Sequence, residues 1–336
     1  MPNIIIHLTQ EQINDLSQNR DIVIGTSGED ASLCIKVPEK HHGPSVFELF
    51  TEQISRLKQR GNLRTAETYT AAFKKFRKFR KEQDIAPCDI TADLTEAFQN
   101  SLKEQQLSMN TISFHLRKLR AIYNKAAERG LTINQHPFRH VYTGIGKTVK
   151  RAISIKEMKR IKEVELRDHL LCFSRDMFLF SFYTRGMAFV DMAFLKKSDI
   201  KDGMLTYMRK KTGQQLTIRW ERTMQQIVDQ YAVEESEFLL PIIHCRNGKE
   251  RNQYRNVQTK INRSLKDVAR VAGIDHKLTM YVARHSWATI ARQMKVPLNI
   301  ISTGMGHTNE KTTEIYLKSV DMSIVDNANW QIIKSI

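Results

Sequence analysis

The most constraining feature of this sequence is a series of amphipathic helical patterns between residue 45 and about residue 130. Apolar side chains recur there at three- and four-residue intervals, the spacing that places them on one face of an α-helix. Capping residues separate four such stretches, and the last of them ends near Gly130. The stretches begin near Ser45, Thr65, Asp89 and Ser108. The pattern therefore predicts a module of four helices.

Two of the four expected helices have strongly basic polar faces. In the second helix, lysines and arginines lie between the aromatic residues, and in the fourth they flank the apolar stripe. One basic face is ordinarily a solvated surface, but two in one small module favour contact with a phosphate backbone. The chain also has a formal net charge of +17, which favours a polyanionic partner. The candidate DNA-binding residues are Lys74, Lys75, Lys78, His115 and Lys118.

The chain divides into an N-terminal segment, two domains and a linker. Its 336 residues are enough for two ordinary domains. Residues 1–44 form a segment to which the sequence assigns no role, and residues 45–134 form the helical module. Residues 135–151, which contain proline and glycine, are expected to be a linker. Residues 152–336 form a second domain.

The second domain is expected to be mainly helical with one β-hairpin. Met204–Met208 and Gln215–Arg219 alternate as strands do, and Thr212 and Gly213 between them are typical of a turn. Residues 321–336 predict a short amphipathic tail helix. The fold class is therefore mainly α: a four-helix domain, then a mixed, mostly α domain with a small β-hairpin or sheet.

No motif indicates a bound metal or nucleotide. The cysteines, Cys34, Cys88, Cys172 and Cys245, are far apart and form no CxxC pair, so a zinc ribbon is not expected. The chain has no HExxH cluster and no GxxxxGKS or GxxxxGKT loop for nucleotide phosphates. It also lacks a signal-peptide pattern and an apolar run long enough to span a membrane. We expect a cytoplasmic protein that needs no cofactor or metal.

The densest set of reactive residues lies near the C-terminus. Tyr281 and Arg284 stand three residues apart, Gly306 and His307 follow, and Tyr316 comes nine residues after that histidine. This order and spacing resemble the C-terminal box of the tyrosine recombinase (phage integrase) family. Each residue alone is a weak signal, but the combined pattern is specific.

The resemblance extends upstream and covers roughly residues 45–320. The segment around Thr184, Arg185 and Asp191 resembles the family's first arginine box, and Lys211 at the hairpin turn resembles its catalytic lysine. The N-terminal helical module resembles the family's core-site-binding, SAM-like domain.

Two positions depart from the family's pattern. Aligning Asp191 with the family's acid places Ala188 where the first arginine belongs, and the arginine nearby is Arg185. On a helix, Arg185 and Ala188 would share a face, so we expect the Arg185 side chain to reach the phosphate from one turn away. The alternative is that Arg185 only pairs with an acid. Tyr281 replaces a histidine of the family, and its phenol can donate a hydrogen bond but is a poor base near neutral pH. Both departures resemble integrases of the Bacteroidetes branch.

The resemblance implies an enzyme, a site-specific DNA recombinase that cuts and rejoins DNA. Tyr316 is then the nucleophile, and the intermediate is a 3'-phosphotyrosyl bond. Arg284 and Arg185 are expected to offset charge on the phosphate, while His307 adds a hydrogen bond or helps to deprotonate the nucleophile. Lys211 is the candidate proton donor to the leaving oxygen, and its alternative interpretation is a solvated lysine of the turn.

The implied partners are double-stranded DNA and further copies of the chain, up to a tetramer on DNA. A host DNA-bending protein is left open as an accessory partner, as is the choice between integration, as in mobile elements, excision and inversion. The resemblance also implies that the tail helix expected at residues 321–336 packs on a neighbouring protomer. Packing on its own domain is the open alternative. Two other functions also stay open: a non-catalytic DNA-binding protein of the same fold, and a type IB-like topoisomerase.

Overall fold

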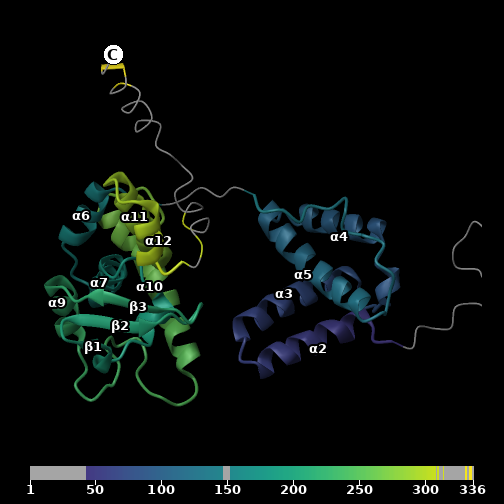
Figure 1. Ribbon diagram of the computed structural model, residues 1–336, viewed down its shortest axis with the longest axis horizontal. Coiled ribbons are helices and arrows are strands. Elements are labelled where there is room, and N and C mark those ends of the chain that lie inside the picture. The colour runs from purple at the N-terminus through teal and green to yellow at the C-terminus, as the bar shows by residue number, and fades with distance from the viewer. Residues whose placement is uncertain are drawn as a thin grey trace, which may run out of the picture. The chain divides into compact units, whose positions relative to one another are not determined.

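The computed structural model describes residues 43–146 and 152–307 and, nearer the C-terminus, Asn309, Thr313, Trp330, Ile333 and Lys334. The chain separates into two compact units, Met1–Lys147 and Thr148–Ile336 (Figure 1). The candidate nucleophile Tyr316, most of the expected tail helix and residues 1–42 of the N-terminal segment lie outside the described residues.

Within residues 43–146, the first unit consists of the four predicted α-helices and one short 3-10 helix. They are α2 (Val46–Gln59), α3 (Leu63–Phe79), η1 (Pro87–Asp89), α4 (Ala92–Glu104) and α5 (Met109–Glu128). Ser45, Thr91 and Ser108 each cap a helix by accepting a hydrogen bond from the backbone N–H three residues later. The second helix ends four residues before its predicted end, because Lys81 and Glu82 take left-handed backbone conformations.

α5 is the central helix of the first unit. It contacts α2, α3 and α4 (Figure 1). Phe50, Phe76 and Tyr123 are buried in the shared core. Because three helices cover α5, few of its positions reach solvent. His115 is only 6% exposed, so the prediction that it lies on a polar outer face of this helix is wrong.

Most of the expected linker is packed onto the first unit. Phe138 and Val141 belong to its buried core. The Ser113 hydroxyl donates to the Gly144 carbonyl at 2.5 Å. Asn110 makes two hydrogen bonds with the backbone of Gly146, accepting from its N–H at 2.7 Å and donating to its carbonyl at 3.2 Å. The helical module therefore extends to residue 146, because side chains of α5 bond a backbone that the proline and glycine content predicted to be loose.

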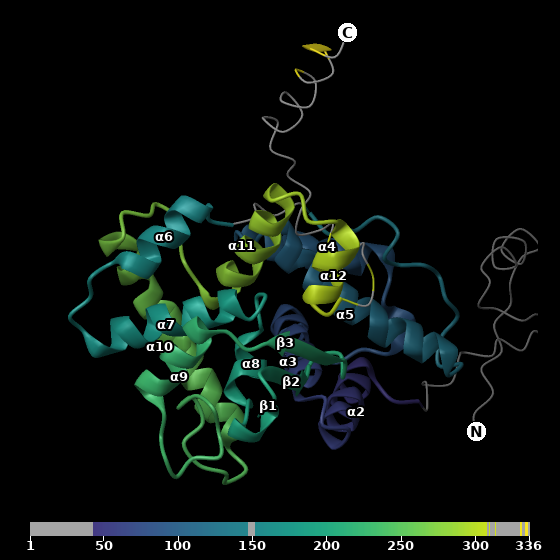
Figure 2. The same cartoon turned by 60° about the vertical axis from the view of Figure 1, so that its left-hand side comes forward.

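The described part of the second unit, residues 152–307, is mainly helical with one small sheet. Its helices are α6 (Ile155–Glu163), α7 (His169–Tyr183), α8 (Phe189–Ala193), η2 (Lys197–Asp199), α9 (Arg222–Tyr231), α10 (Glu250–Val271), α11 (Met280–Gln293) and α12 (Leu298–Gly304). The central helix is α7, which contacts α6, α9, α10 and α11 (Figure 1 and Figure 2). Most of its residues are apolar, as expected for a helix covered on nearly all sides.

The sheet is antiparallel, with the strand order β1-β2-β3. The predicted hairpin is confirmed: β2 is Met204–Met208 and β3 is Gln215–Arg219, and they pair with Leu205 opposite Ile218. A short strand that was not predicted, β1 (Ile200–Lys201), adds to the edge of β2. Because side chains alternate along a strand, Leu205 and Tyr207 of β2 face the core.

Candidate active site

The predicted catalytic side chains that the structure describes come from four parts of the second unit. α11 provides Arg284 and Tyr281, the end of α12 provides His307, the β2–β3 turn provides Lys211, and the α7–α8 turn provides Arg185. The structure brings Arg284 and His307 into direct contact. The candidate nucleophile, Tyr316, lies outside the described residues.

Arg284 is buried and held by two backbone turns. It is 5% exposed. Its Nη1 donates to the Gly186 carbonyl at 2.8 Å, and its Nη2 donates to the Met305 carbonyl at 2.7 Å. Carbonyl oxygens satisfy guanidinium N–H groups without cancelling their charge. Arg284 is therefore fixed in orientation and keeps its positive charge for a substrate.

A glycine makes this placement of Arg284 possible. Gly186 has a φ of +74°, the left-handed region that glycine enters without strain. A Cβ on Gly186 would lie 2.6 Å from the Cα of Arg284. The α7–α8 turn can approach α11 this closely only because residue 186 has no side chain.

The predicted helical relation between Arg185 and Ala188 is wrong. α7 ends at Tyr183, Arg185 has a φ of 60°, and Ala188 is the extended N-cap of α8, so the two residues lie in a turn and share no helix face. The Arg185 side chain passes close to Gly304, and its Nη1 donates weakly to the Thr217 carbonyl of β3 at 3.4 Å. Glycine at 186 and the left-handed residue before it break the helix that the spacing argument assumed.

His307 is held as a neutral imidazole between two partners. Its Nε2 lies 2.9 Å from Arg284 Nη2, and its Nδ1 lies 2.7 Å from the Thr313 hydroxyl. Because a guanidinium only donates, Nε2 accepts and Nδ1 carries the proton. Burial, followed by the charges of Arg284, Arg209 and Lys211, lowers the pKa of His307 to about 4.

A buried acid fixes the hairpin that carries Lys211. Asp191 accepts a hydrogen bond from the backbone N–H of Lys210 at 2.8 Å. The Lys210 ammonium lies over the Phe194 ring, 4.3 Å from its centroid. These contacts leave Lys211 exposed at the turn, with its charge acting on His307. Burial raises the pKa of Asp191, while the Lys210 N–H, Arg209 and Arg284 lower it.

One charged residue of this cluster was missed by the sequence analysis. Arg209 directly follows β2 and is only 8% exposed. Its Nη1 donates to the carbonyl of Gly306, the residue before His307. The signal was present in the sequence: Leu205 and Tyr207 face inward, so the same two-residue period turns Arg209 inward as well.

Tyr281 is 55% exposed, whereas Arg284 of the same helix is buried. It lies in the first turn of α11 and packs edge-on against the buried ring of His285, with ring centroids 4.6 Å apart. The Tyr281 position on the surface of α11 leaves its phenol accessible to a bound polyanion.

The basic residues of the first unit have different environments. Lys74 and Lys78 are exposed on α3. Lys75 is half-buried and donates to the Gln105 side chain at 2.6 Å. Lys118 of α5 is also half-buried, with its ammonium 4.4 Å from the centroid of the Tyr69 ring. Burial, followed by the charge of Lys75, lowers the pKa of His115 to about 4, so His115 is neutral near pH 7.

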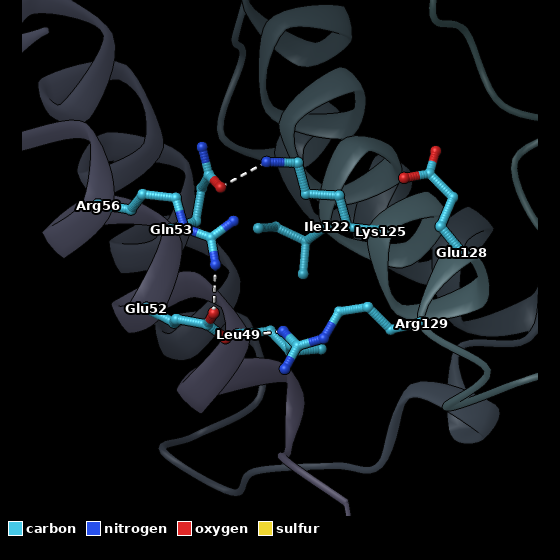
Figure 3. Close-up of a pocket in the computed structure, with 8 residues that line it drawn as sticks. All are labelled: Leu49, Glu52, Gln53, Arg56, Ile122, Lys125, Glu128 and Arg129. Carbon is cyan, nitrogen blue, oxygen red and sulfur yellow. Dashed lines mark hydrogen bonds and ion pairs between the residues drawn. The ribbon is translucent and has the colours of Figure 1, made fainter. Parts of the chain in front are cut away.

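A second basic surface of the first unit, the groove between α2 and α5, carries its own acids. Figure 3 shows Glu52 between Arg56 and Arg129, with which it forms ion pairs of 2.8 and 2.7 Å. Lys125 donates to Gln53 across the same groove (Figure 3). The α2–α5 groove therefore has little uncompensated charge, whereas Lys74 and Lys78 of α3 are better suited to phosphate contacts.

The fold agrees with the comparisons to known proteins. Residues 45–143 match the Phage integrase SAM-like domain, and residues 151–322 match the Phage integrase family. The second match covers more than half of the chain, so the chain belongs to the phage integrase family, whose members include tyrosine recombinases.

Individual relatives resemble the chain over most of its length. It is 26% identical over 260 residues to Tyrosine recombinase XerA of Pyrococcus furiosus, a match that covers 76% of this chain and 83% of the relative. Among solved structures, a lambda integrase tetramer bound to a Holliday junction aligns with a TM-score of 0.64 and 16% identity over 82% of this chain and 78% of that one. The XerH recombinase in a post-cleavage complex aligns with a TM-score of 0.60 and 16% identity over 84% and 85%.

Two features are absent from the described residues. Among them, no helix combines the length and apolar character that a membrane crossing requires. In the same residues, no group of three or more histidine, cysteine or acidic side chains is arranged as a metal site.

Proposed function

We propose that this chain is a site-specific DNA recombinase that acts in the cytoplasm and uses Tyr316 as its nucleophile. The observation that carries the proposal is the Arg284–His307 pair, fixed by the Gly186 and Met305 carbonyls within a fold of the phage integrase family. A buried guanidinium with oriented donors beside a neutral imidazole is suited to an anionic phosphate.

The proposed reaction transfers a phosphoryl group and needs no nucleotide. The phenolic oxygen of Tyr316 attacks phosphorus, the bond from phosphorus to the 5' oxygen breaks, and the 3' phosphate remains on the tyrosine. His307 is neutral at pH 7, and its Nε2 accepts the phenol proton, giving up the hydrogen bond from Arg284 in that step. Lys211 gives a proton to the departing 5' oxygen. A second DNA 5' hydroxyl then reverses these steps on a new strand.

The two basic helices of the first unit are proposed to hold the duplex. Lys74 and Lys78, exposed on one face of α3, contact phosphates, while Lys75 and Lys118 support this face from half-buried positions. Several copies of the chain act together on DNA, as in the lambda integrase tetramer on a Holliday junction. Assignment to the Bacteroidetes branch rests on the two departures at residues 188 and 281.

A covalent-trapping experiment tests the proposal. The full chain first selects its binding site from a random-sequence duplex library, and that duplex is then nicked near its centre to make a suicide substrate. We expect the wild-type chain to form a covalent protein–DNA adduct that survives denaturation. Tyr316→Phe should bind the duplex equally well and form no adduct, because only the phenolic oxygen is lost.

Other outcomes would identify the competing functions. Tight binding of the selected site by the wild-type chain without any adduct would mean a non-catalytic DNA-binding protein. Relaxation of supercoiled plasmids that lack the selected site, at the same rate as plasmids that carry it, would mean a topoisomerase. An undiminished adduct in Tyr316→Phe would rule out this tyrosine as the nucleophile.

A further inference from the structure

Two arginines from different elements converge on one turn beside His307. Arg284 of α11 donates to the Met305 carbonyl, and Arg209 at the end of β2 donates to the next carbonyl, that of Gly306. Both guanidinium groups lower the pKa of His307, so both lie close to its ring. The turn between α12 and His307 is therefore bordered by two positive charges.

The charge balance around this turn favours an anion. Arg209 and Arg284 are 8% and 5% exposed, so solvent screens them poorly. Asp191 is the carboxyl group whose pKa responds to both of them, and burial opposes its ionisation. Among the described residues, two largely buried guanidinium groups lie beside one carboxyl group whose ionisation burial opposes, which leaves an excess of positive charge that a bound phosphate would offset.

Arg209 also shares its element with the proposed proton donor. It lies two residues before Lys211, and Asp191 fixes the intervening Lys210 through a backbone hydrogen bond. A phosphate held at Arg209 would therefore lie near the turn that carries Lys211. Arg185, in contrast, is half-buried and directs its Nη1 to the Thr217 carbonyl of β3.

We propose that Arg209 is a catalytic residue that contacts the scissile phosphate together with Arg284. The two guanidinium groups, which donate to successive carbonyls of the Met305–Gly306 turn, would bind non-bridging oxygens of the phosphate, where negative charge grows during attack. This proposal rests on the proposed recombinase function, and it assigns phosphate binding to an arginine outside the family-like box around Arg185.

A charge-neutral substrate tests whether Arg209 acts on the phosphate itself. Wild type, Arg209→Gln and Arg209→Ala are compared on the selected suicide duplex and on the same duplex with a methylphosphonate at the scissile position. On the phosphate substrate we expect both variants to lose cleavage by about 10²–10³-fold, the range for removing one transition-state donor. On the methylphosphonate, which lacks the negative oxygen, the loss should shrink to within about tenfold of wild type, because less charge needs to be offset.

The glutamine variant separates contact from positioning. Its amide keeps N–H donors but has no charge. If Arg209 only positions the His307 turn, Arg209→Gln should cleave phosphate nearly normally, and Arg209→Ala should lose activity equally on both substrates. Either result would overturn the proposal, as would full activity of Arg209→Ala on phosphate.

Control variants keep the outcomes distinct. Arg270→Ala removes a 78% exposed arginine side chain, paired with Asp267 on α10, and should not change cleavage. Arg185→Ala, measured in parallel, shows whether the methylphosphonate substrate instead restores the cleavage that is lost when Arg185 is removed. Failure of the wild-type chain to form any adduct would refute the recombinase function, whereas a normal wild-type adduct with unrescued Arg209 variants would refute only the role of Arg209.

Discussion

The two units of this protein use positive charge in different ways. In the first unit, Lys74 and Lys78 are exposed along α3. In the second unit, Arg209 and Arg284 are buried, and each donates to a carbonyl of the turn that follows α12. Exposed lysines on one helix face attract any nearby phosphate, whereas buried and oriented guanidinium groups select one position.

The difference indicates how each unit should respond to mutation. Exposed charges act additively and through salt-sensitive attraction, so removing one weakens binding without altering geometry. Buried charges depend on the backbone that orients them, so a change that moves this backbone should abolish function even when every charged side chain is kept. Three predictions test this contrast.

The largest effect is expected from Gly186→Ala. The new methyl group would meet the Arg284 Cα at 2.6 Å, and the φ of +74° would be strained. Left-handed strain costs about 1–2 kcal/mol, and overpacking against backbone costs about 1–3 kcal/mol more. Because Arg284 must move, we expect cleavage to fall at least about 100-fold, measured as the adduct-forming rate beside chemical denaturation monitored by tryptophan fluorescence.

Gly203→Ala provides the matched control for that variant. Gly203 has a similar φ of +71°, but nothing lies within 4 Å of the position that its Cβ would take. It should lose about 1–2 kcal/mol of stability through backbone strain alone and retain cleavage. Equal loss of activity in both variants would show that strain, and not the contact with Arg284, causes the effect.

A smaller, graded effect is expected from the double substitution Lys74→Ala and Lys78→Ala. Two fewer phosphate contacts should weaken binding of specific and random duplexes alike and reduce the slope of log affinity against log salt by about 2. Fluorescence anisotropy at a series of salt concentrations measures both quantities. Lys103→Ala on α4, exposed but outside the proposed interface, is the control. An unchanged slope in the double variant would remove α3 from the DNA contact surface.

The smallest effect concerns the acid sensitivity of the first unit. Burial first, and Lys75 second, lower the pKa of His115 from 6.5 to about 4, so the unfolded chain binds its proton at higher pH than the folded unit does. The stability associated with neutral His115 is therefore complete above about pH 6.5 and is lost as pH falls towards 4.

His115→Gln should remove that dependence. The slope of the free energy of unfolding against pH should differ between wild type and His115→Gln by at most about 1.4 kcal/mol per pH unit, the value for one proton. Hydrogen exchange of the α5 amides between pH 7 and pH 5, corrected for intrinsic rates, measures the change. His140→Gln, at an exposed position of the same unit, should leave the dependence as it is in the wild-type chain. Identical pH profiles for wild type and His115→Gln would contradict the assignment.

Local patterns predicted much of the architecture. The caps at Ser45, Thr91 and Ser108 and both strands of the hairpin lie where periodicity and turn chemistry place them, since each depends on a few neighbouring residues. The errors have a common cause. His115, Arg185 and the segment before residue 147 were interpreted from local pattern, but packing of distant elements decided their environments.

The sequence by itself determined the helical module, the hairpin and the family, and it named Arg284, His307 and Tyr316 by their order and spacing. Only the tertiary structure decided how the charges are arranged. It placed Gly186 against Arg284 across 98 residues of sequence and Arg209 against Gly306 across 97. Spacing along the chain fixes which residues share one helix or strand, but the orientation of a buried charge depends on carbonyls that the fold brings from elsewhere.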